Sequence, residues 1–204
     1  MGMELEFKLA VATPAQLEQI LYDKYVAEVR QDEYVMLNMA TTYYDTPDRR
    51  LGARSWTLRL RQENDDFVAT LKTPGKSRAR GEWQCQASNI HSAIPMLVEA
   101  GAPAELTTLL EDQTIVPICA ARFIRRAANV AFADGTVCEL CGDVGMLIGG
   151  TREENLCEIE VELKEGSAGT TEAFAQELMK RFGLQEEPRS KFFRASALAK
   201  ERAQ

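Results

Sequence analysis

Two short segments that alternate acidic and apolar residues, one near each end of the chain, constrain the fold more than any other feature. They are Glu4-Leu5-Glu6-Phe7-Lys8 and Glu158-Ile159-Glu160-Val161-Glu162. Alternate side chains of a β-strand share a face, so each segment predicts an amphipathic strand with its charges on one side. Carboxylates about 7 Å apart repel by roughly 2 kcal/mol at an effective dielectric constant near 20. An enclosed face would therefore need cations, whereas the alternative is an ordinary solvated outer face.

The middle of the chain carries the opposite charge with the same period of two. Leu58-Arg59-Leu60-Arg61 places two guanidinium groups on one face of a strand, and Val68-Ala69-Thr70-Leu71-Lys72 follows after the polar turn Asn64-Asp65-Asp66. We expect a β-hairpin that bears three cations. Arginine binds phosphate through forked hydrogen bonds, and lysine binds it as a compact charge. Acidic strands at both ends with basic strands between them indicate a site for a metal-bound polyanion.

Composition limits the class of protein. A chain of 204 residues with 45% hydrophobic and 27% charged residues is long enough for one domain, 1–204, with a full core. A net charge of −7 argues against a nucleic-acid partner, which would favour a basic surface. We find no apolar run of membrane-spanning length, and the N-terminus is charged at once, unlike a signal peptide. A cytoplasmic protein without a membrane partner is expected.

The cysteines predict free thiols and no zinc site. There are five of them, an odd number, with irregular spacing. Cys138 and Cys141 form a C-x-x-C pair, but neither a second pair nor any histidine besides His91 is available to complete a zinc site. We expect buried or half-buried thiols, with His91 at the surface.

The local pattern predicts a mainly β protein with flanking helices, of the α+β class. Thr13-Pro14-Ala15-Gln16 has the signature of a helix start, and Gly183 has that of a helix end. Many antiparallel strands with charged inner faces favour a closed barrel, because closure removes sheet edges and permits a polar lumen. Strands are expected near residues 3–12, 28–44, 55–63, 67–73, 79–88, 113–133, 136–144 and 155–164. Helices are expected over 14–25, within 91–112, over 170–182 and around residue 191.

Six motifs follow one another along nearly the whole chain. Through this ordered set the chain resembles the CYTH superfamily, also called triphosphate tunnel metalloenzymes. The motifs are Glu4-Leu5-Glu6-Phe7-Lys8, Tyr43-Tyr44-Asp45-Thr46-Pro47, Leu58-Arg59-Leu60-Arg61, Thr70-Leu71-Lys72, Cys157-Glu158-Ile159-Glu160-Val161-Glu162-Leu163 and Ser190-Lys191. The resemblance implies a closed antiparallel eight-stranded β-barrel. Its lumen would bind a small-molecule triphosphate with divalent ions, Mg²⁺ or Mn²⁺, two of them.

The resemblance also implies roles for individual residues. The implied metal ligands are Glu4, Glu6, Glu139, Glu158 and Glu160, whereas Glu162 and Asp143 stay open as outer carboxylates. The implied phosphate-binding residues are Lys8, Arg59, Arg61, Lys72, Arg125 and Lys191. The implied catalytic group is Lys8, Arg59, Arg61, Lys72 and Glu82, with Glu82 supporting the basic side chains. Arg125 matches the family's arginine better than Arg126, because it follows Phe123 by two positions.

The likeness is greater to bacterial CYTH domains that hydrolyse inorganic tripolyphosphate, through Leu156–Glu160 and Phe123-Ile124-Arg125. It implies hydrolysis to pyrophosphate and phosphate. Similar thiamine triphosphatases place a tryptophan two residues before the first paired arginine. Here that position is Thr57, and Trp56 is one residue out of register, which predicts that it faces the other side. A class IV adenylyl cyclase, a thiamine or nucleoside triphosphatase and a non-catalytic polyphosphate-binding protein stay open, as does the choice between monomer and homodimer.

Overall fold

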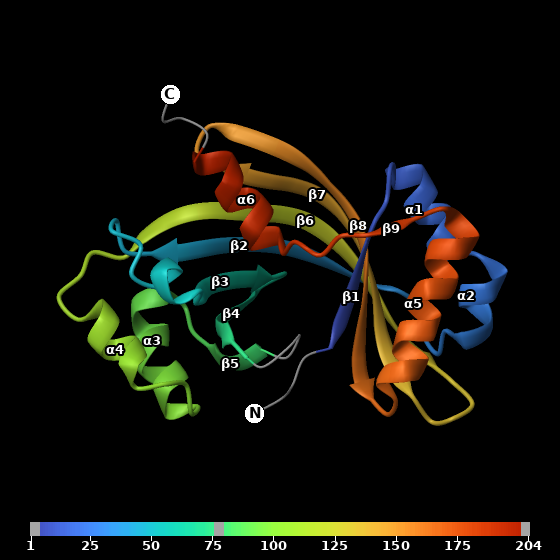
Figure 1. Cartoon of the computed structure of the whole chain (residues 1–204), viewed down its shortest axis with the longest axis horizontal. Coiled ribbons are helices and arrows are strands. Elements are labelled where there is room, and N and C mark those ends of the chain that lie inside the picture. Colours follow the sequence, from blue (N-terminus) through green and yellow to red (C-terminus); the bar gives the residue numbers. More distant parts are fainter. Residues whose placement is uncertain (1–4, 76–79, 201–204) are drawn as a thin grey trace.

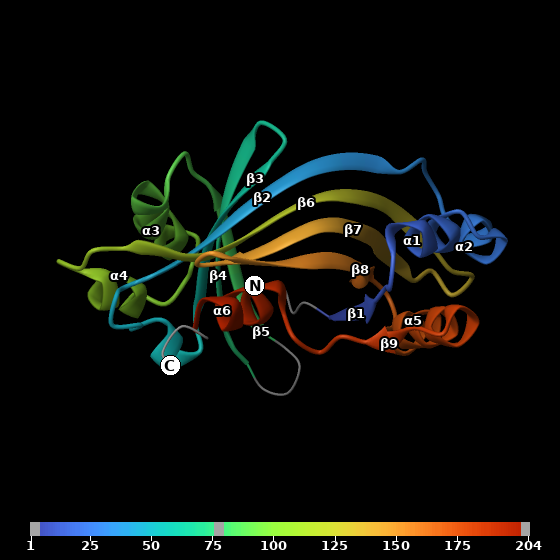
Figure 2. The same cartoon turned by 90° about the horizontal axis from the view of Figure 1, so that it is seen from above.

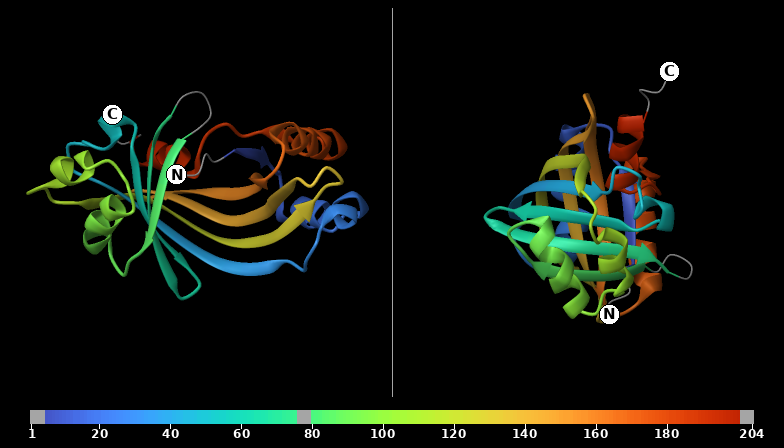
Figure 3. Two further views of the ribbon diagram at one scale, coloured as in Figure 1. Left: turned by 90° about the horizontal axis from the view of Figure 1, so that it is seen from below. Right: turned by 90° about the vertical axis from the view of Figure 1, so that its left-hand side faces the viewer.

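The computed structural model, which describes residues 5–75 and 80–200, contains one antiparallel sheet that curls around a central space (Figures 1 and 3). The strand order is β5-β4-β3-β2-β6-β7-β8-β1-β9. In chain order the strands are β1 (Glu6–Ala10), β2 (Val35–Asp45), β3 (Thr57–Glu63), β4 (Asp66–Pro74), β5 (Arg80–Gln86), β6 (Val116–Ala131), β7 (Val137–Gly149), β8 (Arg152–Glu165) and β9 (Gln185–Glu186). The long strands β2, β6, β7 and β8 lie side by side (Figure 2).

The helices cover the sheet in three places. They are α1 (Pro14–Leu21), α2 (Lys24–Val29), a 3₁₀ turn η1 (Gly52–Arg54), α3 (Ile90–Glu99), α4 (Glu105–Leu110), α5 (Ala168–Phe182) and α6 (Lys191–Lys200). Helices α1, α2 and α5 bury the outer face at one end of the long strands, and α3 and α4 bury the outer face of β3 to β5 (Figure 1). Helix α6 instead packs against the inner face of β6, β7 and β8.

The predicted closed eight-stranded barrel is wrong. The sheet has nine strands, and no pairing within residues 5–75 and 80–200 joins β5, at one end of the order, to β1 or β9 at the other. Strand β9 is a two-residue addition that pairs with Leu9 and Ala10. From β9 the chain crosses to α6, the last helix described (Figure 1). A period of two reveals which face of a strand is charged, but it contains no information on whether the two ends of a sheet meet.

The start of β2 differs from its prediction as well. The range 28–44 was expected as one strand, but Lys24–Val29 is helical and β2 begins at Val35. The side chain of Asp23 accepts a hydrogen bond from the Tyr25 backbone N–H at 2.9 Å and so caps this short helix. The β-branched residues of α2 favour a strand, and in the sequence this preference is a stronger signal than the weak helix cap.

Other local signals are confirmed. The Thr13 hydroxyl oxygen accepts a hydrogen bond from the backbone N–H of Gln16, and the side-chain Oε1 of Gln16 accepts one from the backbone N–H of Ala12. Gly183 ends α5 with φ 65°, a left-handed conformation that glycine adopts without strain. The five cysteines are free and buried or half-buried, and His91 is exposed. Of the described helices, none is long and apolar enough to cross a membrane.

Helix α6 sits close to β7 because Gly149 has no side chain. A Cβ atom at Gly149 would collide with the backbone of Ala195 and Ala199. Ala195 is fully buried in a cluster with Leu147 and Leu156 from the inner face of the sheet. This close contact fixes Lys191, the first residue of α6, over the inner face of β7 and β8.

Candidate active site

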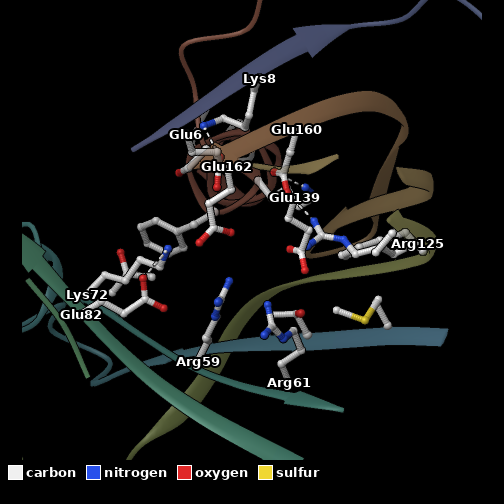
Figure 4. A pocket seen from close by; sticks show the side chains of 18 of the residues that line it. Glu6, Lys8, Arg59, Arg61, Lys72, Glu82, Arg125, Glu139, Glu160 and Glu162 are labelled. Carbon is white, nitrogen blue, oxygen red and sulfur yellow. Dashed lines mark hydrogen bonds and ion pairs between the residues drawn. The ribbon is translucent and has the colours of Figure 1, made fainter. Parts of the chain in front are cut away.

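The curled sheet encloses a cavity of about 980 Å³ between an acidic wall and a basic wall (Figure 4). The acidic wall is formed by β7, β8 and β1, and the basic wall by β3 and β4 with β5 beside them. Among the described residues, seven cationic and eight carboxylate side chains line the cavity. The interior is therefore densely charged and close to neutral, as expected for a site that binds both cations and anions.

The basic wall carries Arg59, Arg61 and Lys72. On β3, Arg59 and Arg61 lie two residues apart and point into the cavity, as the period of two predicts (Figure 4). Their Nε atoms are buried and have no hydrogen-bond partner among the described residues. Buried guanidinium donors without acceptors fit an anion that carries several oxygens.

Carboxylates of the basic wall hold two of these cations. Arg61 forms an ion pair with Glu63, and the Nζ atom of Lys72 lies 3.1 Å from Oε2 of Glu82. Burial and the nearby charge of Arg59 lower the pKa of Arg61 from its usual value. Glu82 thus lies beside Lys72, and the supporting role that the resemblance implies for Glu82 stays a prediction.

The acidic wall contains three directly opposed glutamates, which we call the open row: Glu139, Glu162 and Glu6. The strand register places Glu139 of β7 opposite Glu162 of β8, and Glu162 opposite Glu6 of β1. All three line the cavity. Lys8 binds Glu6 at 3.0 Å, and burial lowers the pKa of Lys8 while the charges of Glu6 and Glu160 raise it more, so it lies above the ordinary value.

The next position along β8 is Glu160, which meets two cations. Arg125 forms ion pairs with Glu160 and, through two hydrogen bonds of 2.7 and 2.8 Å, with Asp143. The Nζ atom of Lys191 lies 2.7 Å from Oε1 of Glu160. Burial opposes ionisation of Glu160, but the charges of Lys191 and Arg125 outweigh it and hold its pKa well below the usual range. Glu160 is therefore an ionised hydrogen-bond acceptor at the cavity wall.

Further along the same strands lie Asp143 and Glu158, which we call the sealed pair. Both are fully buried, and neither is among the residues that line the cavity. The Nζ atom of Lys191 is 2.7 Å from Asp143 and 2.5 Å from Glu158, and Arg194 of α6 binds Glu158 at 2.9 Å. Helix α6 thus covers the sealed pair and supplies Lys191 and Arg194 to it, whereas Arg125 reaches Asp143 from β6.

The residues present fit a hard divalent cation. One oxygen each of Asp143, Glu158 and Glu160 lies within 4.8 Å of the others, so this buried acidic cluster could bind a metal ion. Carboxylate oxygens are the donors that Mg²⁺ and Mn²⁺ prefer. The ammonium of Lys191 contacts all three carboxylates and supplies a positive charge at this position.

Most of the predicted site residues come together. Those that line the cavity are Glu6, Lys8, Arg59, Arg61, Lys72, Glu82, Arg125, Glu139, Glu160 and Lys191. Glu4 lies outside the described residues. Glu158 does not line the cavity, and Glu162, which the sequence left open, does. Arg126 is on the outer face of β6 and pairs with Glu18 of α1. Of these two neighbouring arginines, Arg125 is therefore the one that lines the cavity.

Several cavity residues were not predicted, and three of them are Lys164, Glu63 and Tyr43. Lys164 extends the inner face of β8 by one more step of two, and Glu63 does the same for β3 after Arg61. Both could have been found by continuing the alternation to the end of each strand. Tyr43 packs on Phe192 of α6, with 5.2 Å between ring centroids; it begins the motif Tyr43–Pro47, but the sequence predicted no role for it in the site.

The register at the tryptophan is as predicted. Trp56 is buried with α3 and α4 on the outer side of the sheet, whereas Thr57 lines the cavity. An aromatic platform for thiamine is therefore missing at this position of the described cavity wall.

Comparison with known proteins gives concordant matches. The family model of the CYTH domain matches residues 2–195. An inorganic triphosphatase of Haemophilus influenzae is 34% identical over 178 residues, which are 82% of this chain and 47% of that protein. The chain therefore spans about half the length of this curated relative.

Solved structures share the fold. A putative adenylyl cyclase from Hippeastrum, described as having a dominant triphosphatase activity, is 19% identical, with a TM-score of 0.57 over 98% of this chain and 96% of that one. A putative adenylate cyclase from Bacillus halodurans is 20% identical, with a TM-score of 0.58 over 93% of this chain and 96% of that one. At such identities the likeness extends to the architecture alone.

Proposed function

The chain belongs to the CYTH domain family, and on this premise we propose that it hydrolyses inorganic tripolyphosphate to pyrophosphate and phosphate with the help of divalent metal ions. The main supporting observation is that Arg59, Arg61 and Lys72 on one wall of the cavity face the carboxylates Glu6, Glu139, Glu160 and Glu162 on the other wall. A tripolyphosphate chain carries several negative charges and no apolar part. It therefore suits a cavity lined by charged groups.

The cationic side chains hold and orient the phosphates in this proposal. Arg59 and Arg61 donate their unpaired N–H groups to phosphate oxygens from one wall, and Lys72 adds a point charge. Lys8, Arg125 and Lys191 do the same from the other wall. Because these groups are fixed before the reaction, they stabilise the charge that spreads over the phosphoryl oxygens and the pyrophosphate leaving group.

The carboxylates hold the metal ions in this proposal. We assign Glu6, Glu139 and Glu160 as ligands, with Glu162 beside them and Glu4 as a further candidate. The bound ions, two of Mg²⁺ or Mn²⁺, would neutralise phosphate and lower the pKa of a water molecule near the terminal phosphorus. One P–O bond then breaks, the water oxygen joins the terminal phosphorus, and the released proton passes to solvent or a carboxylate. We assign no metal ion to the buried cluster of Asp143, Glu158 and Glu160, because the ammonium of Lys191 already contacts all three carboxylates, and Glu158 serves chiefly to fix Lys191.

One experiment separates this function from its alternatives. The purified protein is incubated with Mg²⁺ or Mn²⁺ and with tripolyphosphate, ATP or thiamine triphosphate, and phosphate, pyrophosphate and cyclic AMP are measured. Metal-dependent release of phosphate and pyrophosphate from tripolyphosphate supports the proposal. Faster turnover of ATP or thiamine triphosphate, or formation of cyclic AMP, would assign another substrate. Tight binding without turnover would indicate a polyphosphate-binding protein.

A further inference from the structure

Lys164 lies where the open row needs a cation. Glu139 and Glu162 are directly opposite each other on neighbouring strands. Like charges at such positions are only about 5 Å apart at Cβ and destabilise a sheet. The Nζ atom of Lys164 lies 3.0 Å from Oε1 of Glu162 and 3.4 Å from Oε2 of Glu139. A single ammonium thus neutralises both carboxylates at once.

The position of Lys164 also brings it within reach of a ligand. It follows Glu162 by two residues on β8, so it shares the inner face with the glutamates, and it lines the cavity. Its side chain is 40% exposed, whereas that of Lys191 is 10% exposed. Lys164 can therefore change partners without unfolding its surroundings, because its long stem is free to turn.

We propose that Lys164 is an internal counter-ion of the open row, which a divalent metal ion displaces from Glu139 and Glu162, and that the displaced ammonium then positions a phosphate group of the substrate. This inference rests on the proposed function. An ammonium and a divalent ion compete for the same carboxylate oxygens. Once the metal holds the carboxylates, the freed ammonium stands beside a cavity filled with phosphate oxygens.

Two measurements on Lys164→Met test the proposal, because it predicts tighter binding of the metal ion and a higher KM for the substrate. Without the competing ammonium, Mn²⁺ alone should bind more tightly, by about five- to tenfold in a calorimetric titration without substrate. Without the phosphate contact, the KM for tripolyphosphate should rise, by about fivefold or more. Lys164→Arg keeps a positive charge and should restore most of the KM. Lys180→Met, which removes an exposed lysine from α5, should change neither value.

Each other outcome overturns the inference. Unchanged Mn²⁺ affinity in Lys164→Met would mean that the ammonium does not compete with metal. Weaker binding of both Mn²⁺ and tripolyphosphate would mean a structural role. If thermal melts show that Lys164→Met is unfolded, Lys164→Gln is measured in its place. A wild-type protein that binds Mn²⁺ but does not hydrolyse tripolyphosphate would refute the proposed function. The Mn²⁺ titration would still test whether the Lys164 ammonium competes with the metal ion for Glu139 and Glu162.

Discussion

Glu139 and Glu162 of the open row lie on the same face of β7 and β8 as the sealed pair, yet the two groups have different surroundings. Glu139 and Glu162 of the open row face the cavity and pair with the half-exposed Lys164. Asp143 and Glu158 of the sealed pair are buried under α6 and pair with its cations. The alternation E-x-E-x-E therefore defines a face, but the element that covers each position decides what its carboxylate can do.

Glu160 lies between the two groups, and its loss should have the largest effect. Glu160→Gln removes a charge that faces the cavity and balances Arg125 and Lys191. We expect activity on tripolyphosphate to fall by about 10³-fold and the Mg²⁺ concentration for half-activation to rise. Activity titrated against Mg²⁺ measures both values. Unchanged metal dependence would place Glu160 with the sealed pair.

Glu158→Gln tests the sealed pair. Because it leaves the buried charges of Lys191 and Arg194 without a full partner, we expect the free energy of unfolding to fall by about 3 kcal/mol. Glu162→Gln should keep or raise stability by up to about 1 kcal/mol, because it relieves repulsion within the open row. Urea denaturation without metal compares the two. Equal losses of unfolding free energy in the two variants would contradict the distinction between the open row and the sealed pair. Glu153→Gln, at an exposed position of β8, serves as the control.

The basic wall should respond in activity and not in stability. Arg59→Ala or Arg61→Ala removes a donor that faces the cavity, so activity should fall by about tenfold or more with the fold intact. Leu58→Ala, on the opposite face of β3, should instead cost about 2 to 5 kcal/mol of stability. Steady-state kinetics and thermal melts on all three variants check this. Full activity in both arginine variants would mean that substrate is held elsewhere.

A modest pH dependence of stability is expected near the sealed pair. Hydrogen bonds from Arg189 lower the pKa of Glu187 to about 2 against the opposing effect of burial. A carboxyl whose folded pKa is depressed stabilises the protein above its unfolded pKa and loses that contribution as pH falls toward 2. Since Arg189 is 56% exposed, we expect a loss of about 1 to 2 kcal/mol between pH 5 and pH 2. Glu187→Gln should flatten this part of the stability curve, and a parallel curve would contradict the assignment.

The sequence predicted which side chains gather in the cavity better than it predicted the sheet around them. Alternation correctly placed Arg59 and Arg61 on one face of β3, and Trp56 on the other. It could not reveal that Glu139, Glu162 and Glu6 form one row, because the register between strands far apart in the sequence is fixed by tertiary packing. It also could not reveal the burial of Glu158, which depends on where α6 docks.

For a similar reason, the sequence could not show that the sheet stays open. Strand β9 is two residues long, too short for any periodic pattern, and it pairs with β1 through the hydrogen bonds of an edge. Nothing local distinguishes the end of an open sheet from the seam of a closed one. The motifs of the family supplied the number eight, whereas the pairings that give nine strands are properties of the folded chain.

The pairing of nearly every cavity cation with a carboxylate has a consequence for the speed of encounter. A cavity close to neutrality, in a protein with a net charge of −7, offers a free polyphosphate no long-range attraction. The net negative charge of the protein repels the anion at a distance, and the cations of the cavity attract it only after it has entered. Added salt, which slows attraction between opposite charges, should therefore accelerate this association, and a polyphosphate that arrives already complexed with Mg²⁺ should enter faster than the bare chain.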